Sequence, residues 1–377
     1  METFFKAAGE SDDVDPINEK GDEYVVESFV LEPGDRGKFV ELIREAFVED
    51  AGDVGGTIAF DEETFDLMYG SPKSPRDMFV RALHEPTGRV VGFLGGIPRD
   101  LSVGGRVYKF GVPSWAAVHP AHQKRGLALR MGLKLLELAK EKGFDGGLAF
   151  FEPEAHGIDA ARSLARRSGL KYSEILTIRR FVIRVFDVAR TASVAKLRWY
   201  ERLGLRLLSR CREPENPHVR PYRPGDAPAL HRVAVRQAER CQLAMVRDVD
   251  DLEWYLGHPL VNCVVHEGDD GEPDGFIVAW RFLMAGFGRA VPFGWLDLVH
   301  LDGLPADEAR DVATALCWTS RRRGWAGLQA PLIPYFDPSP FKRAKFVFYP
   351  KSLVVGAFML GDVQLPEKVD SFYFDWR

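Results

Sequence analysis

The feature that most constrains the fold is an internal repeat, in which one short signal opens two halves of the chain. Pro33-Gly34-Asp35 precedes a segment with apolar residues at helical spacing, and Pro224-Gly225-Asp226 precedes another. We expect Asp35 to cap the first of these helices. The copies lie 191 residues apart, whereas a solenoid repeats every 20–50 residues or so. The repeat therefore predicts two copies of one domain-sized unit, for which 377 residues suffice.

The same order of predicted elements follows each signal. Alternating apolar stretches bounded by turn residues predict antiparallel strands at 80–85, 89–105 and 108–118, and again at 262–268, 275–286 and 293–301. A helical pattern follows at 127–143 and 306–324, and then an apolar strand at 146–151 and 326–334. This order predicts an α+β fold of two tandem domains, each a mixed, mostly antiparallel sheet flanked by helices.

Composition shifts set the predicted boundaries. Residues 1–22 are acidic and poor in large apolar side chains, so we expect a mobile tail there. We place the first domain at 23–185 and the second at 218–377. The stretch 186–217 reads as a helical connector that ends in a proline-rich linker.

Charge and hydropathy exclude several classes of protein. A net charge of −5 lacks the basic surplus of a nucleic-acid binder, so no nucleic-acid partner is expected. The sequence holds no apolar run of about 18–20 residues and no signal-peptide pattern, so we expect a cytoplasmic protein without a membrane partner. The four cysteines are scattered without metal-site spacing. Composition leaves the oligomeric state open.

A glycine-containing loop at 123–128 carries the strongest chemical signal. It joins the predicted strand that ends at Val118 to an amphipathic helix, and two cations, Lys124 and Arg125, precede Gly126. The start of a helix presents unpaired N–H groups and the positive end of the helix dipole, and a glycine lets an anion approach without a Cβ in the way. The loop is therefore predicted to bind a phosphate-bearing ligand.

The order strand, QxxGxA, helix resembles motif A of the GNAT superfamily of N-acetyltransferases. The tandem layout, the stretch 91–128 and the terminal SFYFDWR resemble its N-myristoyltransferase branch. This resemblance implies that acetyl-CoA or another acyl-CoA is the cosubstrate, with no metal. It places the coenzyme site at the strand end and the loop, at Val118, Gln123, Lys124, Arg125, Gly126, Leu127 and Ala128.

The resemblance also implies catalytic backbone amides at Trp115 and Ala116, which would polarise the thioester carbonyl. Gly126 is usual in ordinary acetyltransferases and unusual in the myristoyltransferase loop, which favours a short acyl chain. Ala165 stands where many acetyltransferases carry a tyrosine acid. The terminal carboxylate that serves myristoyltransferases as a base is not carried over, because the sequence stops at Arg377.

An amine nucleophile must lose a proton, so a base or a water path is needed. Glu152 and Glu154 follow the strand 146–151, where the two central strands should splay apart, and are the leading candidates. The alternative is that they are loop carboxylates that face water or cap the helix after Gly157. Asp375 or a water chain would then be the base. Asp297 and His300 either line a shared substrate cleft or belong to the core. His119 and His122 lack a third ligand at metal-site spacing.

The second copy has Asp307 and Glu308 at its helix start, where they would repel a pyrophosphate, so a single coenzyme site is expected. Together these features predict an acyl-CoA-dependent N-acyltransferase that acts on a small-molecule or peptide amine by direct attack in a ternary complex. The alternatives are a non-catalytic acyl-CoA-binding or sensing protein and a tRNA-dependent aminoacyl transferase.

Overall fold

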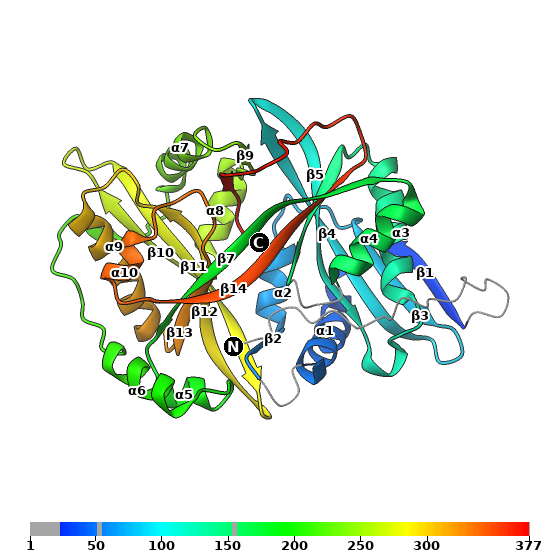
Figure 1. Cartoon of the computed structure of the whole chain (residues 1–377), viewed down its shortest axis with the longest axis horizontal. Helices are drawn as coiled ribbons and strands as arrows, with labels where there is room; N and C mark the ends of the chain where they lie inside the picture. Colours follow the sequence, from blue (N-terminus) through cyan, green and yellow to red (C-terminus); the bar gives the residue numbers. More distant parts are fainter. Residues whose placement is uncertain (1–22, 51–54, 153–156, 377) are drawn as a thin grey trace.

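The computed structural model describes residues 23–50, 55–152 and 157–376 (Figure 1). The predicted acidic tail 1–22 lies outside these ranges. The elements of the first half are β1 (Tyr24–Phe29), the 3-10 turn η1 (Pro33–Asp35), α1 (Arg36–Asp50), β2 (Thr57–Ala59), α2 (Glu62–Tyr69), β3 (Phe79–His84), β4 (Arg89–Val103), β5 (Arg106–Val118), η2 (Pro120–His122), α3 (Leu127–Glu141), β6 (Gly146–Phe151), α4 (Gly157–Ser168) and β7 (Lys171–Val185).

Two short helices, α5 (Val188–Ala192) and α6 (Trp199–Leu208), form the connector. The remaining elements are β8 (Val219–Pro221), α7 (Ala227–Ala238), β9 (Leu243–Ala244), α8 (Val249–Gly257), β10 (Val261–Glu267), β11 (Pro273–Gly286), β12 (Arg289–His300), α9 (Ala306–Arg322), β13 (Gly327–Pro331), α10 (Ser339–Arg343), β14 (Val347–Met359) and β15 (Phe372–Tyr373). The α+β class and the repeated element order are confirmed. None of the described helices is long and apolar enough to cross a membrane.

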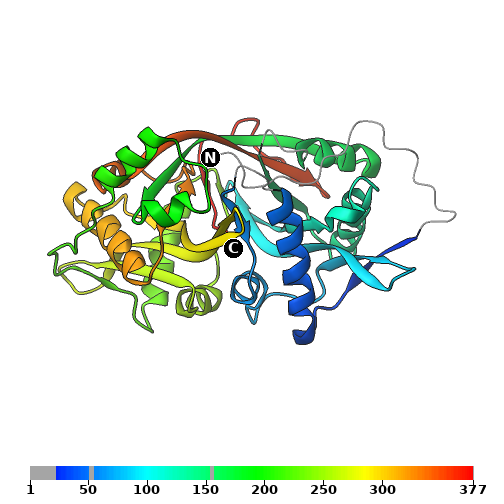
Figure 2. The same ribbon diagram turned by 90° about the horizontal axis from the view of Figure 1, so that it is seen from below.

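The two halves share one sheet. Across the described residues the strand order is β1-β3-β4-β5-β6-β14-β7-β13-β12-β11-β10-β8, with the short strands β2, β9 and β15 attached at its sides. Most neighbours are antiparallel, and the pairs β5–β6 and β12–β13 are parallel. Each half is therefore a mixed sheet, as predicted, and the two join edge to edge in the middle of the molecule (Figures 1 and 2).

The halves exchange their last long strands. β14, from the end of the chain, lies between β6 and β7, while the far end of β7 pairs with β13 of the second half. Figure 1 shows β7 and β14 running side by side across the middle of the molecule. Because each half needs a strand of the other to complete its sheet, we expect the two halves to unfold together.

Alternation along the strands explains why helices cover both faces of the first half. In β4, Phe93 faces α1, where its ring lies 4.7 Å from that of Phe39. The next residue, Leu94, belongs to the cluster on the other face, which holds Met131 of α3. Successive strand side chains point to opposite faces, so one strand serves both helices. In the second half, α7 and α9 contribute in the same way to the clusters on the two faces.

Asp35 does not cap α1 with its side chain as expected. It is the last residue of the turn η1, directly before α1, and its carboxylate accepts a hydrogen bond from the Lys38 ammonium at 3.4 Å. The capping prediction identified the start of the helix and assigned Asp35 the wrong contact. Its counterpart Asp226 likewise makes no cap bond and instead pairs with Arg220 at 2.7 Å.

Candidate active site

The loop between β5 and α3 has the backbone of an anion-binding turn. Gln123 donates a hydrogen bond from Nε2 to the carbonyl of Val118, at 3.3 Å, which ties the loop to the end of β5. Lys124 and Gly126 both have positive φ, 59° and 70°. Alternation of such residues with ordinary ones turns successive N–H groups toward one concave side, which favours an anion.

Gly126 is the N-cap of α3 and makes no side-chain cap, so the first turn, with Leu127 and Ala128, presents its amides at the positive end of a 15-residue helix. A Cβ built on Gly126 would meet nothing within 4 Å, so the space beside it is open. Lys124 and Arg125 are exposed beside this space. The geometry can bind a phosphate or pyrophosphate group.

A β-bulge lies in β5 shortly before this loop. Gly95 pairs with Ser114 and Phe93 pairs with Ala117, so Trp115 and Ala116 together stand opposite Leu94. Trp115 has φ 55°, an uncommon value for a residue with a bulky side chain. Its ring is held 4.4 Å from that of Phe60. Such bulges are frequent next to active sites because they re-aim backbone groups and side chains. Sequence reasoning selected these two residues without foreseeing the bulge.

The strands β5 and β6 separate beyond the middle of β5. Their parallel pairing is confined to Phe110 with Gly146 and Gly111 with Gly147. The later residues of β6 pair only with β14, on the other side. The bulge and the end of β6 therefore lie on the two arms of an opening in the sheet, as the sequence predicted for Glu152.

Glu152 is held by a cation. Its carboxylate forms an ion pair with the ammonium of Lys351 at 2.7 Å, and both side chains are largely buried. Lys351 comes from β14, the strand that the second half contributes to the first. Sequence reasoning could not foresee this partner, because it lies 199 residues away. The site thus contains a carboxylate that already binds an ammonium group. The other predicted base, Glu154, lies outside the described residues.

The second half has a bulge at the corresponding place in its own sheet. Ile277 pairs with Val299 and Ala279 with Leu296, so Asp297 and Leu298 of β12 stand opposite one residue, as Trp115 and Ala116 do in β5. Sequence reasoning singled out Asp297 and did not see that it occupies the bulge.

The helix that follows starts differently from α3. α9 has Pro305 as its N-cap and two acidic residues, Asp307 and Glu308, in its first turn. Negative side chains at that end of a helix disfavour an anionic ligand. The absence of a phosphate-binding loop from the second half remains a prediction.

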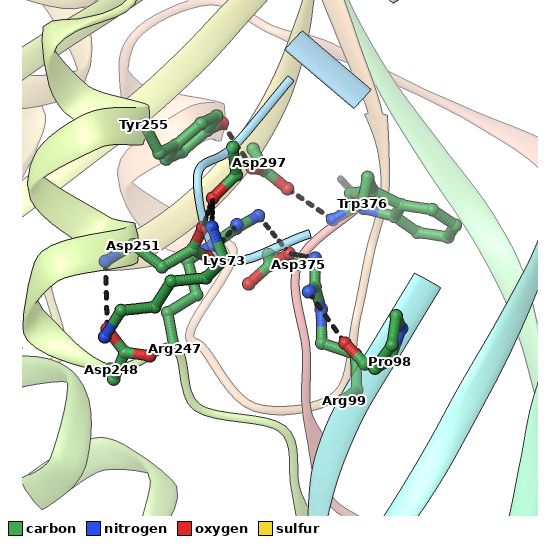
Figure 3. A network of polar contacts seen from close by, with 11 residues as sticks. Lys73, Pro98, Arg99, Arg247, Asp248, Asp251, Tyr255, Asp297, Asp375 and Trp376 are labelled. Carbon is green, nitrogen blue, oxygen red and sulfur yellow. Dashed lines mark hydrogen bonds and ion pairs between the residues drawn. The ribbon is translucent and has the colours of Figure 1, made fainter. Parts of the chain in front are cut away.

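Asp297 is buried in a polar network between the halves (Figure 3). One carboxylate oxygen accepts the backbone N–H of Trp376 at 2.7 Å, and the other accepts the hydroxyl of Tyr255. Burial raises the pKa of Asp297 to about 6, the nearby Asp375 carboxylate acts in the same direction, and Arg247 opposes them. Burial thus makes Asp297 harder to ionise than an ordinary aspartate, and its bond to the Trp376 N–H holds residue 376 in place.

Asp375 is anchored from both halves of the molecule. The guanidinium of Arg247, which lies between β9 and α8, binds Asp375 at 2.5 Å and Asp251 at 2.8 Å. Arg99 of β4 lies 3.7 Å from the same Asp375 oxygen. In Figure 3 the Asp375 carboxylate lies between the two guanidinium groups. Buried charges of this kind are tolerated only when they are paired, so the network fixes residues 372–376 in place.

Aromatic contacts place this terminal segment beside the opening. The ring of Trp376 lies 5.0 Å from Phe150 of β6 and 5.5 Å from Trp295 of β12. Phe374 lies 4.9 Å from the same Phe150 ring. Since Phe150 is two residues before Glu152, the Asp297 network adjoins the end of β6 and links the bulge of the second half to the opening in the first.

The three histidines singled out in the sequence have structural partners. His122 shares a hydrogen bond with the Tyr24 hydroxyl at 2.9 Å, and His119 lies 3.5 Å from the Glu45 carboxylate. His300 is buried, where its pKa falls to about 3, and its Nε2 lies 3.3 Å from the Tyr373 hydroxyl. Among the described residues no group of three or more His, Cys, Asp or Glu side chains could hold a metal ion.

Comparison with known proteins agrees with this geometry. Residues 31–151 match the family model described as the acetyltransferase (GNAT) domain, which covers α1, the bulged strand, the loop and β6. A search of curated protein sequences gives no match.

Solved structures resemble the whole chain. The structure of Saccharomyces cerevisiae N-myristoyltransferase with bound myristoyl-CoA has a TM-score of 0.75 at 14% identity and covers 97% of this chain and 92% of that one. Another structure of the same enzyme, with myristoyl-CoA and inhibitors, has a TM-score of 0.74 at 12% identity and covers 100% and 93%. Residues 31–151 thus match a GNAT acetyltransferase domain, and the chain as a whole has the fold of the N-myristoyltransferase structures.

Proposed function

We propose that this protein is an N-acyltransferase that transfers an acyl group from acyl-CoA to an amine by direct attack in a ternary complex. The observation that carries the proposal is the unit formed by the β5 bulge at Trp115–Ala116 and the loop with positive φ at Lys124 and Gly126. The loop offers amides and cations for the pyrophosphate. The bulge offers backbone groups for the negative charge that develops on the thioester oxygen.

The donor in this proposal carries a short acyl chain, with acetyl-CoA as the first choice, because the loop keeps Gly126 as ordinary acetyltransferases do. The known structures with myristoyl-CoA belong to a protein that shares 14% identity with this chain, so they support the fold and leave the acyl length to experiment. Measuring transfer rates with a series of acyl-CoA donors of increasing chain length tests this preference.

Glu152 is the group we propose to receive the amine. The Glu152 carboxylate already pairs with the Lys351 ammonium at 2.7 Å, so it can also bind the ammonium group of a protonated acceptor amine. The acceptor would compete with Lys351 for this carboxylate. Once the amine has bound, the same carboxylate can accept its proton. Asp297 acts in this proposal as a positioning residue, because it holds the Trp376 amide and thereby the ring that packs on Phe150.

A non-catalytic acyl-CoA-binding protein is the second candidate, and the Glu152–Lys351 pair favours it, since the pair occupies the carboxylate that catalysis would need. A thiol-release assay separates the two. The full chain is given acetyl-CoA and a panel of small amines and peptides. Amine-dependent release of CoA supports the enzyme, whereas tight CoA binding with no release above hydrolysis supports the binding protein.

A further inference from the structure

The connector helix α6 exposes apolar side chains to solvent. Trp199 is 76% exposed, Leu203 54% and Leu207 74%, and the neighbouring Tyr200 is 48% exposed. The first three recur every four residues, so they form one stripe along the helix, and Tyr200 widens it to an arc of about 100°. The only residue of α6 that is fully buried is Leu205, on the opposite side. The arc therefore points straight outward.

Cations lie along one edge of this arc and in the segments on either side of the helix. Over residues 196–212 the chain has six cationic residues and one acidic residue, a net charge of +5, in a protein whose net charge is −5. All six are exposed: Lys196, Arg198, Arg202, Arg206, Arg210 and Arg212. On the helix surface Arg202 and Arg206 directly flank the apolar arc, since each is three residues beyond a member of it. Figures 1 and 2 show α6 on the side of the molecule away from α3.

We propose that α6 is a docking surface for anionic lipid bilayers, on which it lies with Trp199, Leu203 and Leu207 in the headgroup region. An exposed apolar stripe with tryptophan, tyrosine and leucine next to arginines is the pattern of helices that bind at the membrane interface. Juxtaposed arginines add attraction to anionic headgroups. This surface revises the expectation that the protein has no membrane partner and is independent of the proposed catalytic site.

Charge and area argue against a second copy of the chain as the occupant. Two copies that met at α6 would bring two +5 segments together, and like charges at an interface disfavour association. A stable interface also buries roughly 800 Å² on each partner with some 20–30 residues, far more than the four apolar side chains of this arc. A bilayer needs no complementary shape and accepts a narrow stripe.

The test is co-sedimentation of the full chain with vesicles of phosphatidylcholine alone and of phosphatidylcholine with a quarter phosphatidylglycerol. We expect binding to the anionic vesicles, reduced at high salt, and little binding to the neutral ones. Replacing the stripe, in the variant Trp199→Ser/Leu203→Ser/Leu207→Ser, should weaken binding at least tenfold. Replacing the cations, in Arg202→Gln/Arg206→Gln, should weaken it about fivefold for each arginine.

The matched control is Val30→Ser/Val107→Ser, which removes two exposed apolar side chains of the first half and should leave vesicle binding unchanged. All variants change exposed positions, so circular dichroism and thermal melting should match those of the native chain. Failure of the native chain to bind anionic vesicles overturns the proposal, as does binding that survives the triple serine substitution. Sedimentation velocity gives a further refutation, namely a dimer that the triple substitution abolishes without any lipid binding.

Discussion

Gly126 offers the sharpest perturbation of the proposed coenzyme site, because the structure separates the strain of a substitution from its charge. The residue has φ 70°, and the space where a Cβ would stand is open. Alanine at this position therefore carries only the backbone cost of the left-handed conformation, roughly 1–2 kcal/mol. Glutamate carries the same cost and also places a negative charge beside the first turn of α3.

The charge dominates the expected loss of affinity. Two unit charges about 4 Å apart repel by about 4 kcal/mol at the effective dielectric constant of a protein surface, and a pyrophosphate carries more than one charge. Since about 1.4 kcal/mol corresponds to a factor of ten, Gly126→Glu should weaken CoA binding by about a thousandfold or more. Gly126→Ala should weaken it far less, because the open space accepts the methyl group.

Isothermal titration of CoA into the full-length variants measures these effects. The matched control is Gly303→Glu, which adds the same charge before α9, at a glycine with ordinary φ and open surroundings. It should leave the affinity within a few fold of the native value, because the second half is not proposed to bind coenzyme. A folded Gly126→Glu variant that binds CoA as well as the native chain would refute the loop assignment, and a loss of affinity in Gly303→Glu would refute the single site.

Three further predictions follow from the carboxylates. Glu152→Gln should lower turnover by about a hundredfold while CoA affinity stays near native, and a near-native rate in steady-state kinetics would reject Glu152 as base. Burial raises the pKa of Asp297 from 3.8 to about 6 in the folded chain. Between pH 3.8 and pH 6 the folded chain therefore binds more protons than the unfolded chain, so the free energy of unfolding falls as the pH rises through this range. The difference in unfolding free energy between the native chain and Asp297→Asn should therefore fall by about 2 kcal/mol from pH 4 to pH 7 in denaturant titrations. A difference that does not change with pH would exclude the shift. Arg247→Met should lower the free energy of unfolding by about 3–5 kcal/mol, because it leaves buried carboxylates unpaired. The control Lys73→Met, at an exposed ion pair, should leave the melting temperature almost unchanged. Equal losses of stability in the two variants would contradict the structural role of Arg247.

Local patterns in the sequence were enough to predict the internal repeat and the helices and strands that compose it. The strand that ends at Val118, the helix that begins at Leu127 and the strand 146–151 lie where alternation, glycine and apolar spacing predicted them. The exchange of β7 and β14 was not predictable from such patterns. Both are long apolar strands that fit either sheet, and pairing partners far apart in sequence leave no local signal.

The same limit applies to the site. The loop was recognisable because its function depends on a glycine at a helix start, which the sequence displays. The partners of the carboxylates were not, since Lys351 meets Glu152 and Asp375 meets Arg247 only after the last strands have crossed between the halves. A β-bulge adds one residue to a strand without a special residue type, so the shared bulges at Trp115 and Asp297 became visible only in the strand register.

Transfer of the acyl group itself is the most direct measurement. The full chain is incubated with acetyl-CoA labelled in the acetyl group and with pooled amines and peptides, and mass spectrometry follows the label. We expect the label to appear as an amide on an amine acceptor, Gly126→Glu to abolish this product and Gly303→Glu to retain it. Label that stays on CoA, or that leaves only as free acetate while CoA binds at the loop, would contradict an N-acyltransferase.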